Sequence, residues 1–460
     1  MSRFHAQKKD YDDPLRRLRS EFHIPKRSDM DTCIEIDMIQ RSHESVIYLA
    51  GSAIGLQPKL ITTRTTAFLN QWARRGIAAG HTAEPENNCP SWLEAEQVAA
   101  DSMAPIVGAL NSEVTLMGTL TANLHFLLAS FYLPKKAEQG RTRILIEEGA
   151  FASDRYAIQS QIEWHGLDPT SELISIPCNE DGLLSTAAVC DTIELFAHNA
   201  ALLILSGVQF HTGQLLEIPH ITRYARERGI VVGWDLAHAV GNVELKLHEW
   251  DVDFAVWCSY KYLNAGPGAT AGIFVHDRHG KDKNRRRLAG WWGVPIPQRF
   301  EMTQSFAPNV GAAGFKVSSP SILDITAVTA ALQLLNGPGM AKITEKSRNL
   351  TGYLESLLDD IAIQITGNPR VREEHVPWTV ITPRDPAQRG AMLSLRWREG
   401  DRMEQVARHL RDRGVIVDIR KPDIMRITPA PLYNTFEDVW MFAQKLEKAT
   451  IAIGNRDSTS

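Results

Sequence analysis

The amino-acid sequence predicts an α/β protein with a large domain on a mostly parallel sheet and a smaller α+β domain. The first observation is length, since 460 residues are many for one hydrophobic core and ordinary for a large domain plus a smaller one. The second is that short apolar runs alternate with helical stretches from Val46 onward. The third is that several of these runs are continuously apolar, as strands covered by helices on both faces require.

Three segments follow from these patterns. Residues 1–45 are polar and are interrupted by Pro14 and Pro25, and we expect them to form an N-terminal arm that packs on the small domain. Residues 46–330, where strands and helices alternate, are expected to form the large domain. Residues 331–460, where helices and strands interleave differently, are expected to form the small C-terminal domain.

Individual elements follow from the apolar periodicity. In the large domain the expected strands are 143–147, 201–206, 230–235, 253–258 and 272–275, and the expected helices are 123–131, 154–165 and 219–228. In the small domain the expected helices are 350–361, 403–413 and 438–449, and the expected strands are 391–397 and 414–420. Strand–helix alternation implies right-handed crossovers, and ligands of such sheets bind at the carboxyl ends of the strands.

The overall composition argues against several classes of protein. A formal net charge of −4 argues against a general nucleic-acid binder, which would normally show a basic face. The one dense basic run, 285–287, lies among polar residues and is predicted to be a solvated loop. No apolar run approaches the roughly 20 residues that span a bilayer, so no membrane partner is expected.

Cysteine use and the N-terminus favour a cytoplasmic location. The five cysteines are scattered without a CxxC pair, so neither a disulfide framework nor a zinc site is predicted, and no metal is expected. The N-terminus carries Lys8, Lys9 and Asp10 and has no apolar stretch of the kind found in a secretory signal. A reducing cytosol is the simplest location.

The most informative pair is Asp235 and Lys261, each of which follows an apolar strand. A carboxylate buried at a strand end needs a cationic partner, and the pyridinium nitrogen of pyridoxal 5'-phosphate (PLP) is such a partner. A partly desolvated lysine can lose its proton and form a Schiff base with the same cofactor. This spacing, together with the Asp-x-x-His and Ser-x-Lys contexts, predicts a PLP enzyme in which Lys261 carries the cofactor.

A purely structural interpretation of these residues stays open. Asp235 could cap the following helix, and Lys261 could be a surface lysine. His238 could be only the hydrogen-bond partner of a buried aspartate.

Two further positions suit a phosphorylated ring. Thr121 lies just before the helical run 123–131, where a helix N-terminus and a hydroxyl together attract an anion, although a threonine there often only caps the helix. Phe151 follows the strand 143–147 and could stack on a cofactor ring, or could instead be a core residue.

Five longer segments resemble the kynureninase family, and the similarity runs from about Tyr48 to the C-terminal region. The segments are SGVQFHTGQ (206–214), DLAHAVGNV (235–243), WCSYKYLNAG (257–266), GWWG (290–293) and RITPAPLYN (426–434). They are much longer than the Asp/Lys pattern of PLP enzymes in general, so they specify the family more closely.

The resemblance implies a fold-type I PLP enzyme of the aminotransferase class V group, a homodimer with an active site shared across the interface. It implies hydrolysis of L-kynurenine to anthranilate and L-alanine, and of 3-hydroxy-L-kynurenine to 3-hydroxyanthranilate and L-alanine. These reactions belong to tryptophan catabolism leading toward NAD.

The resemblance also implies roles for individual residues. Lys261 would be the Schiff-base lysine, Asp235 would pair with the pyridine nitrogen, and Tyr260 would serve as a general acid. The other residues expected at the cofactor are Leu120, Thr121, Phe151, Ala152, Ser153, Asp154, Ser206, His238, Ser319 and, from the second subunit, Trp291. The residues expected at the substrate are His81, Ser318 and Arg426, and Arg426 would receive the substrate carboxylate.

One departure from the family concerns the segment Ser318-Ser319-Pro320. Animal members have Asn where this chain has Ser319, and that Asn helps to hold both the phosphate and the aromatic ring of the substrate. The shorter serine puts this contact, and the preference between the two substrates, in doubt. His81 matches the residue that those members place beside the ring, and a histidine there suits a phenolic substrate.

Three other functions can be weighed against this interpretation. A cysteine desulfurase needs a nucleophilic cysteine on a mobile loop in the C-terminal half, but the last cysteine of the chain, Cys258, falls in an expected strand. An aminotransferase would depend on a 2-oxo acid. A non-catalytic scaffold with the same fold would show no cofactor absorbance.

Overall fold

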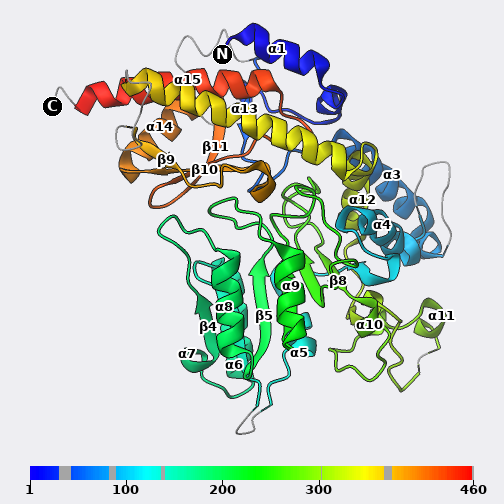
Figure 1. Ribbon diagram of the computed structural model, residues 1–460. Coiled ribbons are helices and arrows are strands. Elements are labelled where there is room, and N and C mark those ends of the chain that lie inside the picture. Colours follow the sequence, from blue (N-terminus) through cyan, green and yellow to red (C-terminus); the bar gives the residue numbers. More distant parts are fainter. Residues whose placement is uncertain (31–42, 82–89, 136–139, 302, 367–375, 458–460) are drawn as a thin grey trace. The chain divides into compact units, whose positions relative to one another are not determined.

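The computed structural model describes residues 1–30, 43–81, 90–135, 140–301, 303–366 and 376–457 (Figure 1). The chain forms two compact units. The terminal unit comprises residues 1–59, 211–214 and 341–460, and the central unit comprises residues 60–210 and 215–340. Among the described helices, none is both long and apolar enough to cross a membrane.

The central unit is built on a seven-stranded sheet with the order β2-β8-β7-β6-β5-β3-β4. Its strands are β2 (Val114–Leu116), β3 (Arg143–Glu147), β4 (Leu173–Ile176), β5 (Ala200–Ser206), β6 (Val231–Asp235), β7 (Phe254–Trp257) and β8 (Gly272–Val275). The five strands from β4 to β7 run parallel, and β8 runs antiparallel to both of its neighbours. The predicted α/β class and its mostly parallel sheet are confirmed.

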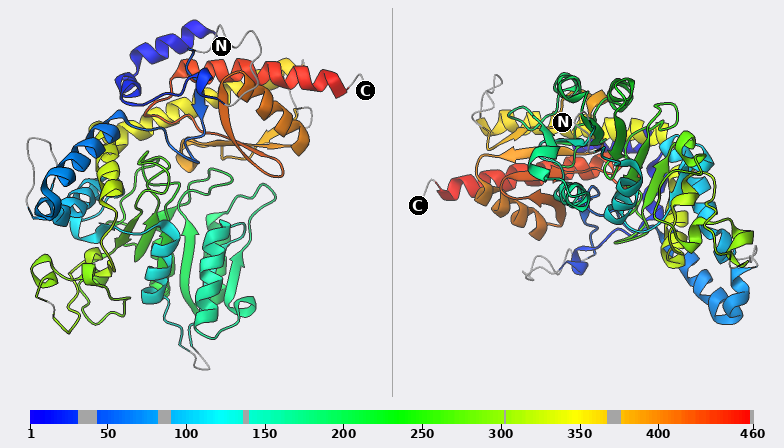
Figure 2. Two further views of the ribbon diagram at one scale, coloured as in Figure 1. Left: turned by 180° about the vertical axis from the view of Figure 1, so that it is seen from behind. Right: turned by 90° about the horizontal axis from the view of Figure 1, so that it is seen from below.

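Helices cover both faces of this sheet, as the continuous apolar strands predicted (Figures 1 and 2). On one face α5 (Leu120–Phe131) and α6 (Ala152–Trp164) pack on alternate strand residues such as Ile144 and Ile204. On the other face α9 (Ile218–Glu227) lies against β6, where the indole N–H of Trp234 donates to Thr222 Oγ1 at 3.0 Å. The remaining helices of the unit are α3 (Lys59–Arg75), α4 (Trp92–Val107), α7 (Pro169–Glu172), α8 (Thr186–Phe196), α10 (Asp277–Gly280), α11 (Ile296–Arg299) and α12 (Ile322–Asn336).

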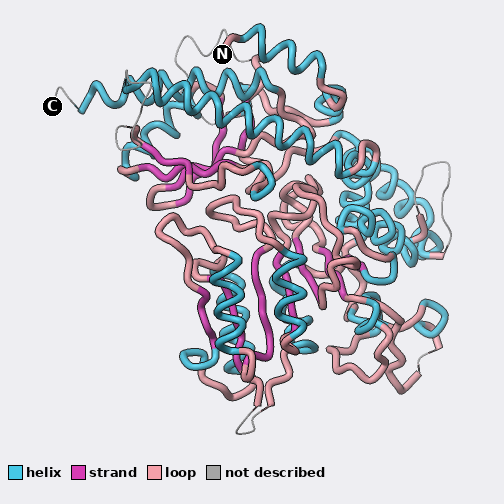
Figure 3. Tube along the Cα trace, viewed as in Figure 1, coloured by secondary structure: helices cyan, strands magenta, loops and turns pink. Residues whose placement is uncertain are grey.

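The terminal unit is an α+β layer with a five-stranded sheet of order β1-β11-β12-β10-β9 (Figure 3). Its strands are β1 (Ile47–Leu49), β9 (Trp378–Val380), β10 (Leu393–Trp397), β11 (Val415–Arg420) and β12 (Ile424–Ile427), and its helices are α1 (Arg3–Asp12), α13 (Met340–Thr366), α14 (Gly400–Asp412) and α15 (Phe436–Asp457). The core includes Trp378 and Trp397, whose ring centroids are 5.0 Å apart.

The N-terminal residues are fastened to the terminal unit by polar contacts. The carboxylate of Asp10, in α1, accepts the backbone N–H groups of Phe436 and Glu437 at 2.7 and 3.0 Å and so caps the start of α15. The buried Asp13 carboxylate lies 2.8 Å from the Nζ atom of Lys346 in α13.

Most expected elements are confirmed to within about three residues, and three expectations need correction. The expected helix 350–361 is part of the longer α13, which begins ten residues earlier. The expected helix 438–449 is part of the longer α15, which ends eight residues later. The basic run 285–287 is not simply a solvated loop, because two of its guanidinium groups pack on buried rings. Arg285 lies 4.3 Å from the Phe131 centroid, and Arg287 lies 4.6 Å from the Phe315 centroid.

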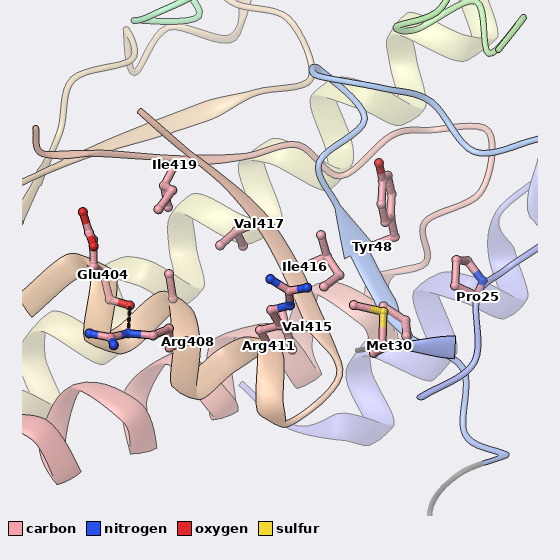
Figure 4. A pocket seen from close by; sticks show the side chains of 12 residues that line it. Pro25, Met30, Tyr48, Glu404, Arg408, Arg411, Val415, Ile416, Val417 and Ile419 are labelled. Carbon is pink, nitrogen blue, oxygen red and sulfur yellow. Dashed lines mark hydrogen bonds between the residues drawn. The ribbon is translucent and has the colours of Figure 1, made fainter. Parts of the chain in front are cut away.

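A pocket of about 540 Å³ lies within the terminal unit (Figure 4). Aliphatic side chains of β11 form its floor, and Tyr48 of β1 and Arg408 and Arg411 of α14 stand around it. Its described lining contains no lysine, histidine or cysteine. Lys261 and Asp235 lie instead at the carboxyl ends of the central strands.

Candidate active site

Polar side chains end three adjacent strands of the central sheet. Glu147, Ser206 and Asp235 are the last residues of β3, β5 and β6, and the register places Ser206 beside Asp235. All three are buried in the structure. Lys261 follows β7, the next strand in the sheet, so the fold brings Asp235 and Lys261 to the same sheet edge.

The carboxylates at this edge are held by short hydrogen bonds. Ser206 donates its backbone N–H and its hydroxyl to the two Glu147 carboxylate oxygens at 3.0 and 2.6 Å. The Oδ1 atom of Asp235 accepts the backbone N–H of Ala237 at 2.8 Å. Asp154, in the first turn of α6, lies close enough to Asp235 for the two carboxyl groups to interact. Sequence reasoning missed Glu147, although a glutamate that ends an apolar strand was a visible signal.

These buried carboxyl groups share too little positive charge for all of them to ionise. Burial, and then the charge of Asp235, raise the pKa of Glu147 to about 7. Burial raises the pKa of Asp154 well above its ordinary value, Asp235 raises it further, and the Lys261 amine lowers it. The Oδ1 atom of Asp154 is buried and has no hydrogen-bond partner among the described residues. The site therefore fits a group that brings a cationic nitrogen.

An anion site lies at the same edge, where two helices begin. The Oγ1 atom of Thr121 in α5 and the Oγ atom of Ser153 in α6 are 2.7 Å apart. The first turns of α5 and α6 therefore lie close together, and each brings backbone N–H groups and one hydroxyl, from Thr121 and Ser153. The helical run begins at Leu120 rather than Asn123, which places Thr121 inside the first turn and not before it. This arrangement suits a phosphate.

Two expected aromatic side chains follow strands of this sheet, Phe151 after β3 and His238 after β6. Phe151 stands at the N-cap of α6, is about half exposed, and contacts the Phe210 ring edge-on at 5.2 Å. Phe151 is therefore not a core residue, which was the alternative to a ring-stacking role. His238 is buried, and its ring centroid is 6.3 Å from that of Tyr262.

The turn that carries Lys261 is held by local hydrogen bonds. Asn264, at a positive φ of 60°, donates its N–H to the Lys261 carbonyl at 3.0 Å. The buried Ser259 hydroxyl donates to the carbonyl of Thr270 at 2.8 Å. Burial, and then the neighbouring Cys258, raise the pKa of Tyr260, so its hydroxyl keeps its proton at neutral pH.

The remaining expected site residues of the central unit lie on its surface. The rings of His81 and Trp291 lie 5.8 and 5.9 Å from Phe300, and all three side chains are exposed. The Trp291 indole N–H donates to the carbonyl of Arg299 at 2.7 Å. Ser318 and Ser319 are also exposed. Among the described residues, no hydrogen bond or ring contact joins these four residues to the Lys261 cluster.

Arg426, the residue expected to bind the substrate carboxylate, belongs to the terminal unit. Its side chain is 1% exposed, and its Nε atom donates to Asp418 Oδ2 at 2.5 Å. The strand register places Asp418 directly opposite Arg426 on the adjacent strand. The guanidinium is thus oriented before any ligand binds.

Two family models match the sequence. The model described as aminotransferase class-V matches residues 47–394, and the kynureninase C-terminal domain matches residues 343–446. Among curated relatives, kynureninase 1 of Aspergillus oryzae is 46% identical, covering 96% of this chain and 92% of its own length. Kynureninase of Coccidioides immitis is 43% identical, covering 100% and 96% respectively.

Solved structures show the same fold at much lower identity. An apo cysteine desulfurase of Thermococcus onnurineus NA1 has a TM-score of 0.69 at 17% identity, covering 92% of this chain and 100% of its own. The cysteine desulfurase CsdA of Escherichia coli has a TM-score of 0.70 at 15% identity, covering 95% and 98%. At this identity the likeness concerns the fold alone.

Glu147→Gln is expected to flatten the pH dependence of stability. The folded-state pKa of Glu147, about 7, lies above the ordinary value of 4.5, so its protonation stabilises the folded chain. That contribution is full below the unfolded pKa and is lost as the pH rises through about 7. Between pH 8 and pH 6 the wild type should gain about 1 kcal/mol that the variant does not gain.

Denaturant unfolding of the cofactor-free protein at pH 6, 7 and 8 measures this difference. Glu148→Gln, which removes the same charge from the neighbouring exposed residue, is the matched control and should follow the wild type. Parallel pH profiles for wild type and Glu147→Gln would refute the assignment.

Proposed function

From the premise that this chain belongs to the kynureninase family, within the aminotransferase class V group, we propose how its residues carry out the reaction of that family. The chain is a PLP-dependent hydrolase that cleaves the Cβ–Cγ bond of L-kynurenine and 3-hydroxy-L-kynurenine, releasing the anthranilate and L-alanine. The observation that carries the proposal is the buried set of Asp235, Asp154 and Glu147 at the sheet edge that also bears Lys261.

When bound, PLP supplies a protonated ring that accepts the electron pair left at the substrate Cα. The Lys261 amine would be the covalent attachment point, and the Asp235 carboxylate would pair with the ring nitrogen. Phe151 would stack on the ring, and the first turns of α5 and α6 would hold the phosphate. The other proposed contacts are Leu120, Thr121, Ala152, Ser153, Asp154, Ser206, His238, Tyr260, Ser319 and, from the second subunit, Trp291.

The side chains of the site divide the proton transfers between them. The Lys261 amine would remove the proton from the substrate Cα. Water adds to the Cγ carbonyl of the substrate, and the Cβ–Cγ bond then breaks so that Cγ leaves as the carboxyl carbon of the anthranilate. Tyr260, which stays protonated at neutral pH, would donate a proton to Cβ. Arg426, already oriented by Asp418, receives the substrate carboxylate in a two-point contact. His81 and Ser318 lie at the aromatic end of the substrate.

We also propose that the protein is a cytoplasmic homodimer. The segment 288–310 exposes the large apolar side chains of Leu288, Trp291, Phe300, Phe306 and Val310, which favours burial against a second subunit. The three cysteines among the described residues are all free thiols, in keeping with a reducing compartment. Sedimentation should give twice the 51.4 kDa chain mass, and a monomer would contradict a site shared between subunits.

Lys261→Ala is expected to abolish turnover, because it removes both the attachment point and the base. The rate of anthranilate and alanine release should fall by about a thousandfold or more, and the absorbance band of the lysine-linked cofactor should vanish. Lys246→Ala, an exposed lysine paired only with Glu249, is the control and should keep both properties. An undiminished rate in Lys261→Ala would sink the proposed function.

The preference between the two substrates is expected to depend on His81 and Ser319. The wild type should favour 3-hydroxykynurenine, because the His81 ring can form a hydrogen bond with the phenol group of that substrate. Replacing His81 by Phe should lower kcat/KM about tenfold for 3-hydroxykynurenine and much less for kynurenine. Parallel assays of both substrates measure the ratio. An equal loss for both would assign His81 a general rather than a selective contact.

A further inference from the structure

A second polar cluster lies in the central unit, away from Lys261. It consists of Glu113, which precedes β2, His248, in the turn before β7, and His276, which follows β8. One ligand atom from each of the three lies within 4.8 Å of the others. β8 runs antiparallel to β7, and its last residue, Val275, pairs with Phe254 at the start of β7. β6 runs parallel to β7, so its end at Asp235 lies at the other edge of the sheet. The cluster therefore occupies the opposite sheet edge from the proposed active site.

The two ring nitrogens of His276 have different neighbours. The Nε2 atom lies 3.2 Å from the Asp251 Oδ1 atom, a position that suits a proton on Nε2. The Nδ1 atom accepts the Arg278 backbone N–H at 3.3 Å, which is consistent with a lone pair there. A ring that donates one N–H to a carboxylate and offers its other nitrogen is the usual state of a metal-bound histidine.

Carboxylate oxygens face the same lone pair. The Nδ1 atom of His276 lies 3.1 Å from Asp277 Oδ1 and 3.6 Å from Glu113 Oε1. The Nδ1 atom already accepts the Arg278 N–H, so these are contacts between acceptors. A cation between the atoms would turn that repulsion into attraction.

The separations match the size of a small tetrahedral ion. Zinc bonds to imidazole nitrogen and carboxylate oxygen at about 2.0–2.1 Å, so its ligand atoms lie about 3.3–3.4 Å apart. Glu113 Oε1 lies 2.9 Å from His248 Nδ1 and 3.6 Å from His276 Nδ1, on either side of that value. Glu113 is also held in place, because its Oε2 atom accepts the Leu110 N–H at 2.9 Å and its Oε1 atom accepts the Asp277 N–H at 2.8 Å.

We propose that Glu113, His248 and His276 bind a divalent zinc ion, with a water molecule as the fourth ligand. Two imidazoles and one carboxylate suit zinc. His248, whose side chain is 37% exposed, provides the entry path, whereas Glu113 is fully buried. The ion would tie β2, the turn before β7 and the start of α10 together, so its role is structural. The proposed ion departs from the sequence-based expectation of no metal, which rested on the cysteines alone.

Metal binding to the full-length protein tests the proposal without reference to activity. Protein prepared without metal-affinity resin and dialysed against a chelator is titrated with Zn²⁺, and separately with Co²⁺ as a spectroscopic substitute. We expect one ion per chain, the visible bands of tetrahedral Co²⁺, and a zinc-dependent rise in Tm.

Variants distinguish a metal site from a network of hydrogen bonds. His248→Gln should weaken Co²⁺ binding at least tenfold, while His198→Gln, at an exposed histidine outside the cluster, should leave it unchanged. His248→Cys should restore binding and add a sulfur-to-cobalt charge-transfer band, which a merely structural histidine could not produce. Absence of stoichiometric binding in the wild type, or equal binding by His248→Gln, would overturn the proposal.

Discussion

The candidate site depends on one electrostatic constraint, which is the burial of three carboxyl groups at one end of a parallel sheet. Glu147 and Asp235 end strands of that sheet, and Asp154 opens the helix that packs over it. Desolvation makes three negative charges there unfavourable unless positive charge is supplied. In the proposed site the Lys261 amine would supply part of this charge, and the protonated ring nitrogen of the cofactor would supply the rest. A strand-end aspartate and a nearby lysine thus occur together because buried negative charge must be balanced where water is excluded.

The fold meets this constraint through its topology. Parallel strands bring their carboxyl ends to one edge, and the helices that follow begin at the same edge with unpaired N–H groups. The carboxylates therefore stand on strand ends, where the cationic ring is needed. The hydroxyls of Thr121 and Ser153 stand on helix starts, where a phosphate is needed. The cationic ring of the proposed cofactor would thus lie at the ends of strands, and its phosphate would lie at the starts of helices.

Much of this was visible in the sequence, and the remainder depends on contacts that no linear pattern shows. Continuous apolar runs predicted the strands and the sheet edge to within a few residues, because helices on both faces demand such runs. The pairing of Glu147 with Ser206 escaped prediction, since it joins residues 59 positions apart through strand order. The packing of Arg285 on Phe131 escaped it for the same reason. His81, Ser319 and Trp291 could be named only through the family resemblance, and the single chain leaves them exposed.

The state of the ring nitrogen tests the central claim most directly. Nitrogen-15 NMR of the enzyme loaded with cofactor labelled at that position reports whether the nitrogen carries a proton. The account predicts a pyridinium signal that persists at alkaline pH in the wild type and changes to that of a neutral pyridine in Asp235→Asn. A neutral pyridine nitrogen in the wild type at pH 7 would show that the buried carboxylates balance some other charge, and would contradict the account.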